Sequence, residues 1–199
     1  MSLQINGKTD ASTGADMENQ ILLGHLPLFL HKAPKEVLVV GMGSGITLGA
    51  VLSHPVEKVD AIEIERKVVE AAKYFAEYAD NALEDRRVRL IIADGRNYLS
   101  ARSTGSGLKK YDVITSEPSN PWLTGSSKLF TKEYFELLKK GIKEDGIVLQ
   151  WINLYALDIE GLKRVISAFN EVFPEVAAFG MVASNDLALV GSNNPIVFD

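Results

Sequence analysis

The chain of 199 residues contains no cysteine and only three histidines, which narrows the chemistry open to it. Without cysteine it has no disulfide, no thiolate nucleophile and no cysteine metal ligand. The histidines are His25, His31 and His54, and their spacing matches no zinc motif, so we expect no metal site. The lack of cysteine also fits a reducing compartment, and we predict a cytoplasmic protein.

Long apolar runs and a surplus of basic residues are also missing. No window approaches the ~18 uncharged apolar residues of a membrane span, so we expect no membrane contact by this domain. Lys and Arg total 21 against 26 Asp and Glu, and this balance argues against a nucleic-acid binder. The start, Met1-Ser2-Leu3, lacks the basic and apolar segments of a signal peptide.

Strand-like and helix-like segments alternate along the chain. The predicted strands are rich in β-branched residues and cover 36–40, 58–64, 88–93, 111–116, 146–152, 176–181 and 187–191. The predicted helices cover 17–31, with Asp16 as N-cap, 46–53, 67–78, 96–102, 132–141 and 162–172. This order predicts an α/β fold with a seven-stranded, mostly parallel sheet and helices on both faces. We divide the chain into an N-terminal strand or hairpin appendage, 1–16, and a Rossmann-like catalytic domain, 17–199.

Polar or glycine-rich motifs follow four successive predicted strands. Right-handed crossovers bring such loops to one edge of the sheet, where ligands bind. The first motif is Gly41-Met-Gly-Ser-Gly45, in which glycine permits a sharp turn and close approach to a ligand. We assign Gly41, Gly43 and Gly45 to cofactor binding. The run is not a full GxGxxG, because Ile46 follows it, and a tight turn without a ligand is the alternative.

The next two strands end in acidic residues. Glu63 lies 18 positions after Gly45, where a carboxylate that accepts hydrogen bonds from ribose hydroxyls is expected. Glu65 would take this role if the strand register differed by two. Asp94-Gly95 ends the third strand, where an aspartate can accept a hydrogen bond from the exocyclic amine of a base. The alternative role of Asp94 is to cap the following helix.

The fourth motif is the loop Ser116-Glu-Pro-Ser-Asn-Pro-Trp122. Its two prolines restrict the loop shape. We place Glu117 at the reacting end of a bound cofactor and Asn120 and Trp122 in a substrate wall. A rigid structural loop with Trp122 in the core is the alternative. The absence of GxGxxG favours an S-adenosylmethionine-type site over a nicotinamide site.

These motifs together resemble those of the spermidine synthase (polyamine aminopropyltransferase) family, over nearly the whole chain from about Leu3 to Asn194. The similar segments are Gln20 with His25-Leu-Pro-Leu28, Val37 to Gly45, Val59 to Ile64, Ile92 to Gly95, and Tyr111 to Pro121 with Leu129-Phe130 and Tyr134-Phe135. The resemblance implies an S-adenosylmethionine-dependent methyltransferase fold. It also implies a transferase of polyamine biosynthesis, which moves an aminopropyl group from decarboxylated S-adenosylmethionine to a polyamine acceptor.

The same resemblance implies roles for individual residues. Gln20 would contact the aminoalkyl tail of the co-substrate, and Glu117 would be the catalytic base or the anchor of an ammonium. His25, Asn120 and Trp122 would contribute to binding of a small amine substrate. Oligomers are typical of the family, so a homodimer is expected.

The sequence departs from the family pattern at three positions. Ser44 stands where the family has an acidic residue that distinguishes the decarboxylated co-substrate from ordinary S-adenosylmethionine. Asn120 replaces a second loop aspartate, and Asn19 replaces a substrate-binding tyrosine. These changes leave two alternatives open: an S-adenosylmethionine-dependent methyltransferase, or a non-catalytic domain that binds a nucleoside or polyamine.

The Glu-Pro-Ser-Asn-Pro-Trp loop is similar to that of a spermidine synthase-like subgroup whose members are often attached to membrane-spanning segments. The resemblance therefore implies that this chain belongs to a larger membrane-attached protein. Gln150 and Trp151 end the fifth strand, close to where the family closes its acceptor pocket. Core packing is the role expected of Trp151.

Overall fold

The computed structural model describes residues 1–198 apart from 6, 15, 103–108, 122–124 and 182–183, so Trp122 lies outside the described residues. The strands are β1 Ser2–Ile5, β2 Lys8–Ser12, β3 Glu36–Val40, β4 Lys58–Glu63, β5 Val88–Ile92, β6 Tyr111–Ser116, β7 Ile142–Ile152, β8 Glu175–Gly180 and β9 Leu187–Ser192. The α-helices are α1 Met17–Phe29, α2 Ile46–Leu52, α3 Arg66–Ala72, α4 Gly95–Arg102, α5 Lys132–Gly141 and α6 Ile159–Val172.

Seven strands form one sheet in the order β5-β4-β3-β6-β7-β9-β8. The pairs from β5 across to β7 are parallel, and β9 runs antiparallel to both of its neighbours. The predicted α/β class with a mostly parallel sheet is therefore confirmed. The chain leaves β3 for β4 on one side and reaches β6 on the other, which makes the β3–β6 boundary a switch point where ligands bind.

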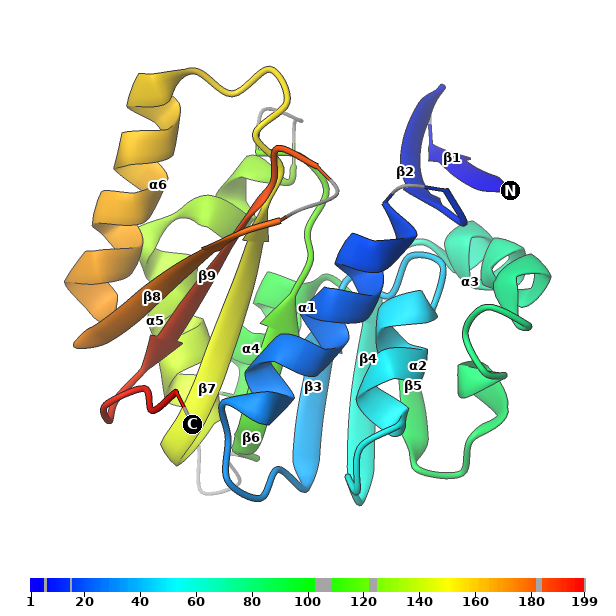
Figure 1. Cartoon of the computed structure of the whole chain (residues 1–199), viewed down its shortest axis with the longest axis horizontal. Helices are drawn as coiled ribbons and strands as arrows, with labels where there is room; N and C mark the ends of the chain where they lie inside the picture. The colour runs from blue at the N-terminus through cyan, green and yellow to red at the C-terminus, as the bar shows by residue number, and fades with distance from the viewer. Residues whose placement is uncertain (6, 15, 103–108, 122–124, 182–183, 199) are drawn as a thin grey trace.

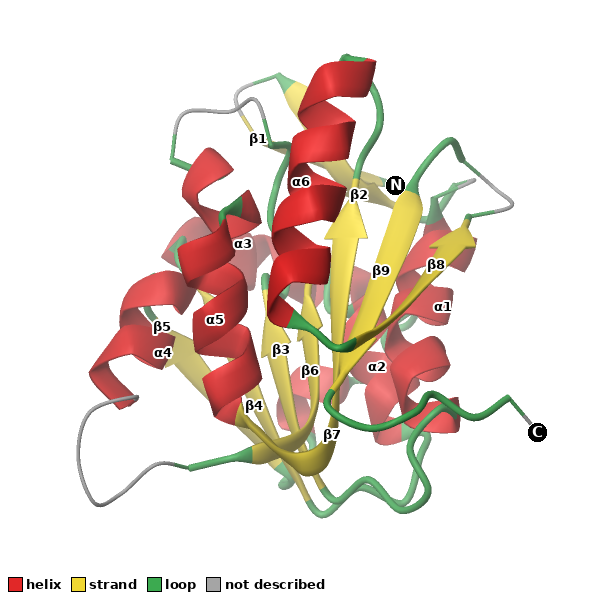
Figure 2. Ribbon diagram, turned by 90° about the vertical axis from the view of Figure 1, so that its left-hand side faces the viewer, coloured by secondary structure: helices red, strands yellow, loops and turns green. Residues whose placement is uncertain are grey.

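Helices cover both faces of the sheet (Figure 2). Along β3, Val37 and Val39 join a hydrophobic cluster with residues of α1, α2 and α3, whereas Leu38 and Val40 join a second cluster with α4, α5 and α6. Successive side chains of a strand point to opposite faces, so a strand buried on both sides reads as an unbroken apolar run. That is why the run 37–40 predicts a central strand.

Helix α1 starts where the sequence predicts it, and Asp16 is its N-cap residue, but the Asp16 side chain makes no capping hydrogen bond. Its carboxylate instead accepts hydrogen bonds from the Ser12 backbone N–H at 2.8 Å and from Gln20 Nε2 at 3.2 Å. The helix predicted over 67–78 is α only as far as Ala72, and a 3₁₀ turn, Lys73–Phe75, follows it.

The N-terminal strands β1 and β2 pair as an antiparallel hairpin. The hairpin lies beyond the edge toward which the parallel strands point (Figure 1). Its Leu3 and Ala11 are paired in register and buried in the same hydrophobic cluster as α1 and α2. The division at residue 16 stays a prediction, because the hairpin shares this core. Within the described part of the chain, no helix has both the length and the apolar character needed to cross a bilayer.

Candidate active site

A cavity of about 430 Å³ lies at the edge of the sheet where the parallel strands end. Its walls come from the hairpin, α1 and the loops that follow β3, β4, β5 and β6. Seven of the residues predicted for the site line it: Gln20, Gly41, Gly43, Glu63, Asp94, Gly95 and Glu117. Loops that follow neighbouring parallel strands meet at one edge, and this brings together residues up to about a hundred positions apart.

Glycine brings the turn after β3 against the loop after β6. Gly41 has φ +90°, and a Cβ atom there would lie 2.4 Å from the carbonyl oxygen of Glu117. Gly43 also has positive φ, and its backbone N–H donates a hydrogen bond to Glu63. Gly45 has φ +86° and starts α2, but it is not among the lining residues. The glycine motif therefore allows two backbones and a carboxylate to converge on one point.

The Glu63 carboxylate is fixed by backbone amides. Its Oε2 accepts a hydrogen bond from the Gly43 N–H at 3.3 Å and its Oε1 accepts one from the Glu65 N–H at 3.0 Å. The residue is buried except where it faces the cavity. An ionised carboxylate has about four acceptor positions, so each oxygen keeps capacity for a ligand hydroxyl.

Asp94 both caps α4 and lines the cavity. Its Oδ1 accepts a hydrogen bond from the Asn97 backbone N–H at 2.9 Å, and its Oδ2 accepts one from Lys128 Nζ at 2.6 Å. Burial works to raise the pKa of Asp94, but these two bonds hold it below its ordinary value. The capping role considered for Asp94 is thus real, and it leaves the carboxylate ionised at the cavity wall.

Glu117 has no cationic partner among the described residues. Its Oε2 accepts a hydrogen bond from Thr47 Oγ1 at 2.9 Å, while its Oε1 is buried without any partner. Burial raises the pKa of Glu117 to about 8, against the opposing effect of the Thr47 bond. Part of the side chain faces the cavity, so a ligand there would contact a carboxyl group that titrates near neutral pH.

Buried polar atoms without partners concentrate around Glu117. Among the described residues, five of the six such side-chain atoms lie at or just beyond the ends of β6 and β7: Thr115 Oγ1, Glu117 Oε1, Asn120 Nδ2, Gln150 Oε1 and Trp151 Nε1. Each unpaired buried polar atom costs about 1–3 kcal/mol, and native proteins pair nearly all of them. Of these five residues, Glu117 and Trp151 line the cavity, where a polar ligand would supply the missing partner.

The cavity is strongly acidic. Seven carboxylates line it, from Asp10, Asp16, Glu63, Glu65, Asp94, Glu117 and Asp186. Lys128 is the only basic residue in the described lining, and it is already bonded to Asp94. Carboxylates in a concave, partly desolvated site attract cations, so the cavity suits a positively charged ligand.

Comparison with known sequences identifies the family. Residues 17–183 match the spermine/spermidine synthase domain. The chain belongs to the spermine/spermidine synthase family. It is 33% identical over 175 residues to a spermidine synthase of Dictyostelium discoideum, which covers 87% of this chain and 60% of that protein. It is 39% identical over 142 residues to a polyamine aminopropyltransferase of Methanocaldococcus jannaschii, which covers 69% of this chain and 46% of that protein. The chain thus spans about half the length of these relatives.

Solved structures of this family have the same fold. A spermidine synthase crystallised with the transition-state analogue AdoDATO superposes with a TM-score of 0.83 at 28% identity, over 96% of this chain and 66% of that chain. The spermidine synthase of Thermotoga maritima gives 0.81 at 28% identity, over 96% and 65%. Human methyltransferase-like protein 13 with SAH gives 0.73 at 21% identity, over 90% and 82%, and shares the fold. The predicted methyltransferase-type architecture is confirmed, while the subgroup with the variant loop stays a prediction.

Two residues assigned to substrate binding from the family resemblance lie outside the cavity lining. His25 Nδ1 is 2.8 Å from His54 Nε2, and the His25 ring stacks on Phe29. Successive residues of a helix turn by about 100°, so His25 lies about 140° around α1 from Gln20, which does line the cavity. Asn120 is buried behind the wall and accepts a hydrogen bond from Lys8.

Asp10, Thr47 and Lys128 also line the cavity, and none of them was predicted from the sequence. Lys8 and Asp10 are two positions apart on β2, and this spacing places two polar side chains on one face of a strand. Thr47 lies in the first turn of α2, directly after the glycine motif. No local sequence pattern predicts where Lys128 lies, so its hydrogen bond to Asp94 could not be predicted.

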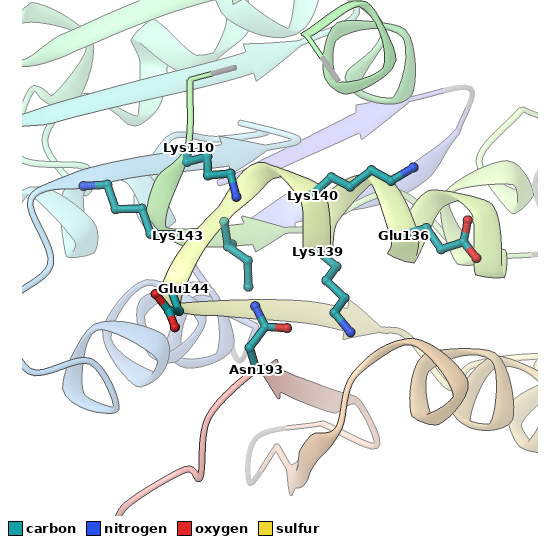
Figure 3. A pocket seen from close by; sticks show the side chains of 8 residues that line it. Lys110, Glu136, Lys139, Lys140, Lys143, Glu144 and Asn193 are labelled. Atoms are coloured by element: carbon teal, nitrogen blue, oxygen red, sulfur yellow. The ribbon is translucent and has the colours of Figure 1, made fainter. Parts of the chain in front are cut away.

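Basic residues surround a second cavity, of about 470 Å³, at the opposite edge of the sheet. It is lined by Lys110, Glu136, Lys139, Lys140, Ile142, Lys143, Glu144 and Asn193. The ends of the four lysines point in different directions (Figure 3). Lys143 is paired with Asp112 at 2.9 Å, and Lys139 donates a hydrogen bond to the Val172 carbonyl. These ammonium groups do not converge on one ligand, so the catalytic candidates remain those of the first cavity.

Proposed function

We propose that this chain is an aminopropyltransferase that uses decarboxylated S-adenosylmethionine as donor and a small amine as acceptor. The observation that carries the proposal is the Glu117 carboxyl group, which has no cationic partner and lies in an acidic cavity of a chain from this family. The named relatives that are aminopropyltransferases support it. Homodimerisation, cytoplasmic location and attachment to a larger membrane protein stay predictions.

The residues around the cavity fit the donor. Glu63 would accept hydrogen bonds from two ribose hydroxyls, because its oxygens are held apart by the amides of Gly43 and Glu65. Asp94 would accept a hydrogen bond from the base amine. Gln20 would face the aminoalkyl tail, with its Oε1 held at 2.5 Å by the Ser44 hydroxyl. The sulfonium and ammonium charges of the donor suit the carboxylates of the lining.

In its ionised form, Glu117 would receive the proton that the acceptor amine must lose. In the reaction, the amine lone pair forms a bond to the carbon next to the sulfonium, the carbon–sulfur bond breaks, and its electron pair leaves a neutral thioether. A primary amine has a pKa of about 10.4, so its proton would move to an ordinary glutamate at a cost of about 8 kcal/mol. The raised pKa of Glu117 lowers this cost to about 3 kcal/mol, within reach of general-base catalysis.

Methyl transfer is the second candidate, and Ser44 is the observation that favours it. A hydroxyl group at this position of the cavity does not repel the carboxylate of ordinary S-adenosylmethionine. The excess of lining carboxylates argues in the other direction, because it favours a donor with more positive charge. Aminopropyl transfer is therefore the function that the site supports best.

To test this, the purified protein is incubated with decarboxylated or ordinary S-adenosylmethionine together with putrescine or spermidine. The products are identified by mass spectrometry. We expect an aminopropylated amine. A methylated product would establish the second candidate, and binding without turnover would establish a binding domain. Glu117→Gln should lower the rate at least about 100-fold with donor affinity kept. Glu63→Ala should weaken donor binding roughly tenfold or more, because charge-assisted hydrogen bonds are lost. Glu70→Gln, which removes an exposed carboxylate, is the control.

A further inference from the structure

The hairpin places an ammonium group between two oxygens beside the cavity. Lys8 Nζ lies 2.9 Å from Asp10 Oδ1 and 2.8 Å from Asn120 Oδ1. Asp10 Oδ2 also accepts a hydrogen bond from Ser119 Oγ at 3.3 Å. Asn120 is 1% exposed, and its Nδ2 is buried without a partner. A carboxylate and a buried amide oxygen thus form a site for one ammonium, and the chain fills that site itself.

This ammonium site adjoins the wall of the catalytic cavity. Asp10 lines the cavity, as do Pro118 and Ser119 from the loop that carries Glu117. Asn120 belongs to the same loop, three residues after Glu117, and lies behind the wall. Asp10 is therefore shared between the cavity and the ammonium site. The ammonium site therefore meets the cavity at Asp10, in the wall that also contains Glu117.

We propose that Lys8 is a specificity-determining residue, because its ammonium group occupies the site between Asp10 and Asn120 that the second ammonium of a diamine would need. This inference rests on the proposed function, since it assumes an amine ligand at Glu117. A diamine must displace Lys8, whereas a monoamine has no group to place there. Lys8 thereby lowers the preference of the chain for acceptors that carry two charges.

Displacement of Lys8 is feasible on energetic grounds. Its side chain is 36% exposed and projects from a short hairpin strand, so it can move into water. An ion pair with this exposure contributes little to stability, and a ligand ammonium can form the same hydrogen bonds to Asp10 and Asn120. Asp10 is only 15% exposed and keeps a cationic partner throughout the exchange. The desolvation cost of the Asp10 carboxylate is therefore nearly the same with the ligand ammonium as with Lys8.

The test is calorimetric binding of putrescine and of butylamine to the full chain. Lys8→Met should bind putrescine roughly two- to fivefold more tightly than the wild type and butylamine with unchanged affinity. Asp10→Asn should weaken putrescine binding and leave butylamine unchanged. Lys163→Met, on α6, removes the same charge from an exposed position and should change neither affinity.

A second measurement keeps the test valid if the hairpin variants unfold. In the wild type, the ¹⁵Nζ signal of Lys8 should shift when putrescine is added and should not shift with butylamine. The proposal is overturned if Lys8→Met leaves putrescine affinity unchanged, if it tightens both amines equally, or if no form of the chain binds putrescine. The expected binding pattern without any aminopropyl transfer would instead refute the proposed function and retain the subsite.

Discussion

The carboxyl group of Glu117 should make the stability of the protein fall as the pH rises. Its pKa is raised from 4.5 to about 8, so between these values the folded protein keeps a proton that the unfolded chain has released. The contribution of Glu117 to the free energy of unfolding is therefore most favourable at or below pH 4.5. This contribution decreases as the pH rises toward 8. Each pH unit in this window costs about 1.4 kcal/mol. Glu117→Gln removes the effect and should be more stable than the wild type by up to about 3 kcal/mol at pH 7.

Urea unfolding at pH 5, 6, 7 and 8 measures this difference for the two proteins. We expect the free energies of unfolding to differ little at pH 5 and to diverge with a slope that flattens above pH 8. Water in the cavity reaches part of the side chain and would reduce the slope without changing its sign. Glu70→Gln shows the effect of losing an exposed carboxylate. A stability difference that is constant across the pH range, or that favours the wild type at pH 8, would refute the assignment of a neutral buried Glu117.

Two further predictions concern the sheet that carries the site. Burial works to raise the pKa of Asp60, but bonds from neighbours that include Arg89 and Tyr111 lower it to about 2, so its contribution is lost as the pH falls from about 4 toward 2. Asp60→Asn should therefore cost roughly 3 kcal/mol in urea unfolding at pH 7 and less at pH 3, and an equal loss at both would contradict this. Gly41→Ala should cost roughly 1–3 kcal/mol, because its Cβ would clash with the Glu117 carbonyl at positive φ. Gly43→Ala, also at positive φ but with open space, should lower the melting temperature less, and equal effects would count against the clash.

Local sequence signals were sufficient for the sheet and for most of the cavity. The apolar run before Gly41 identified a strand buried on both faces, and the glycines after it identified the turn. Glu63 and Asp94 end strands on one side of β3, and Glu117 follows the strand on its other side. Once the strands are parallel, their ends must share one edge, so the convergence of these residues follows from the strand order alone.

Contacts between distant segments could not be predicted in this way. Lys8 and Asn120 are 112 positions apart, and their hydrogen bond depends on how the hairpin leans on the loop after β6. The orientation of α1 was equally unpredictable. Only one side of this helix faces the cavity, and His25 lies on another side, next to His54. Asp16 occupies the predicted N-cap position, yet its side chain bonds to Ser12 of the hairpin and to Gln20 and not to the helix backbone. Tertiary packing overrides a local preference in each case.

The lysines near the cavity divide its carboxylates into two groups. Lys128 pairs with Asp94 at one wall and Lys8 pairs with Asp10 at another, whereas Glu63 and Glu117 have no cationic partner among the described residues. The paired carboxylates stabilise the walls without a ligand. Burial keeps Glu117 protonated, and an incoming positive charge beside it favours its ionised form. A cationic ligand should therefore release a proton when it binds near neutral pH, and an uncharged analogue of the same shape should not.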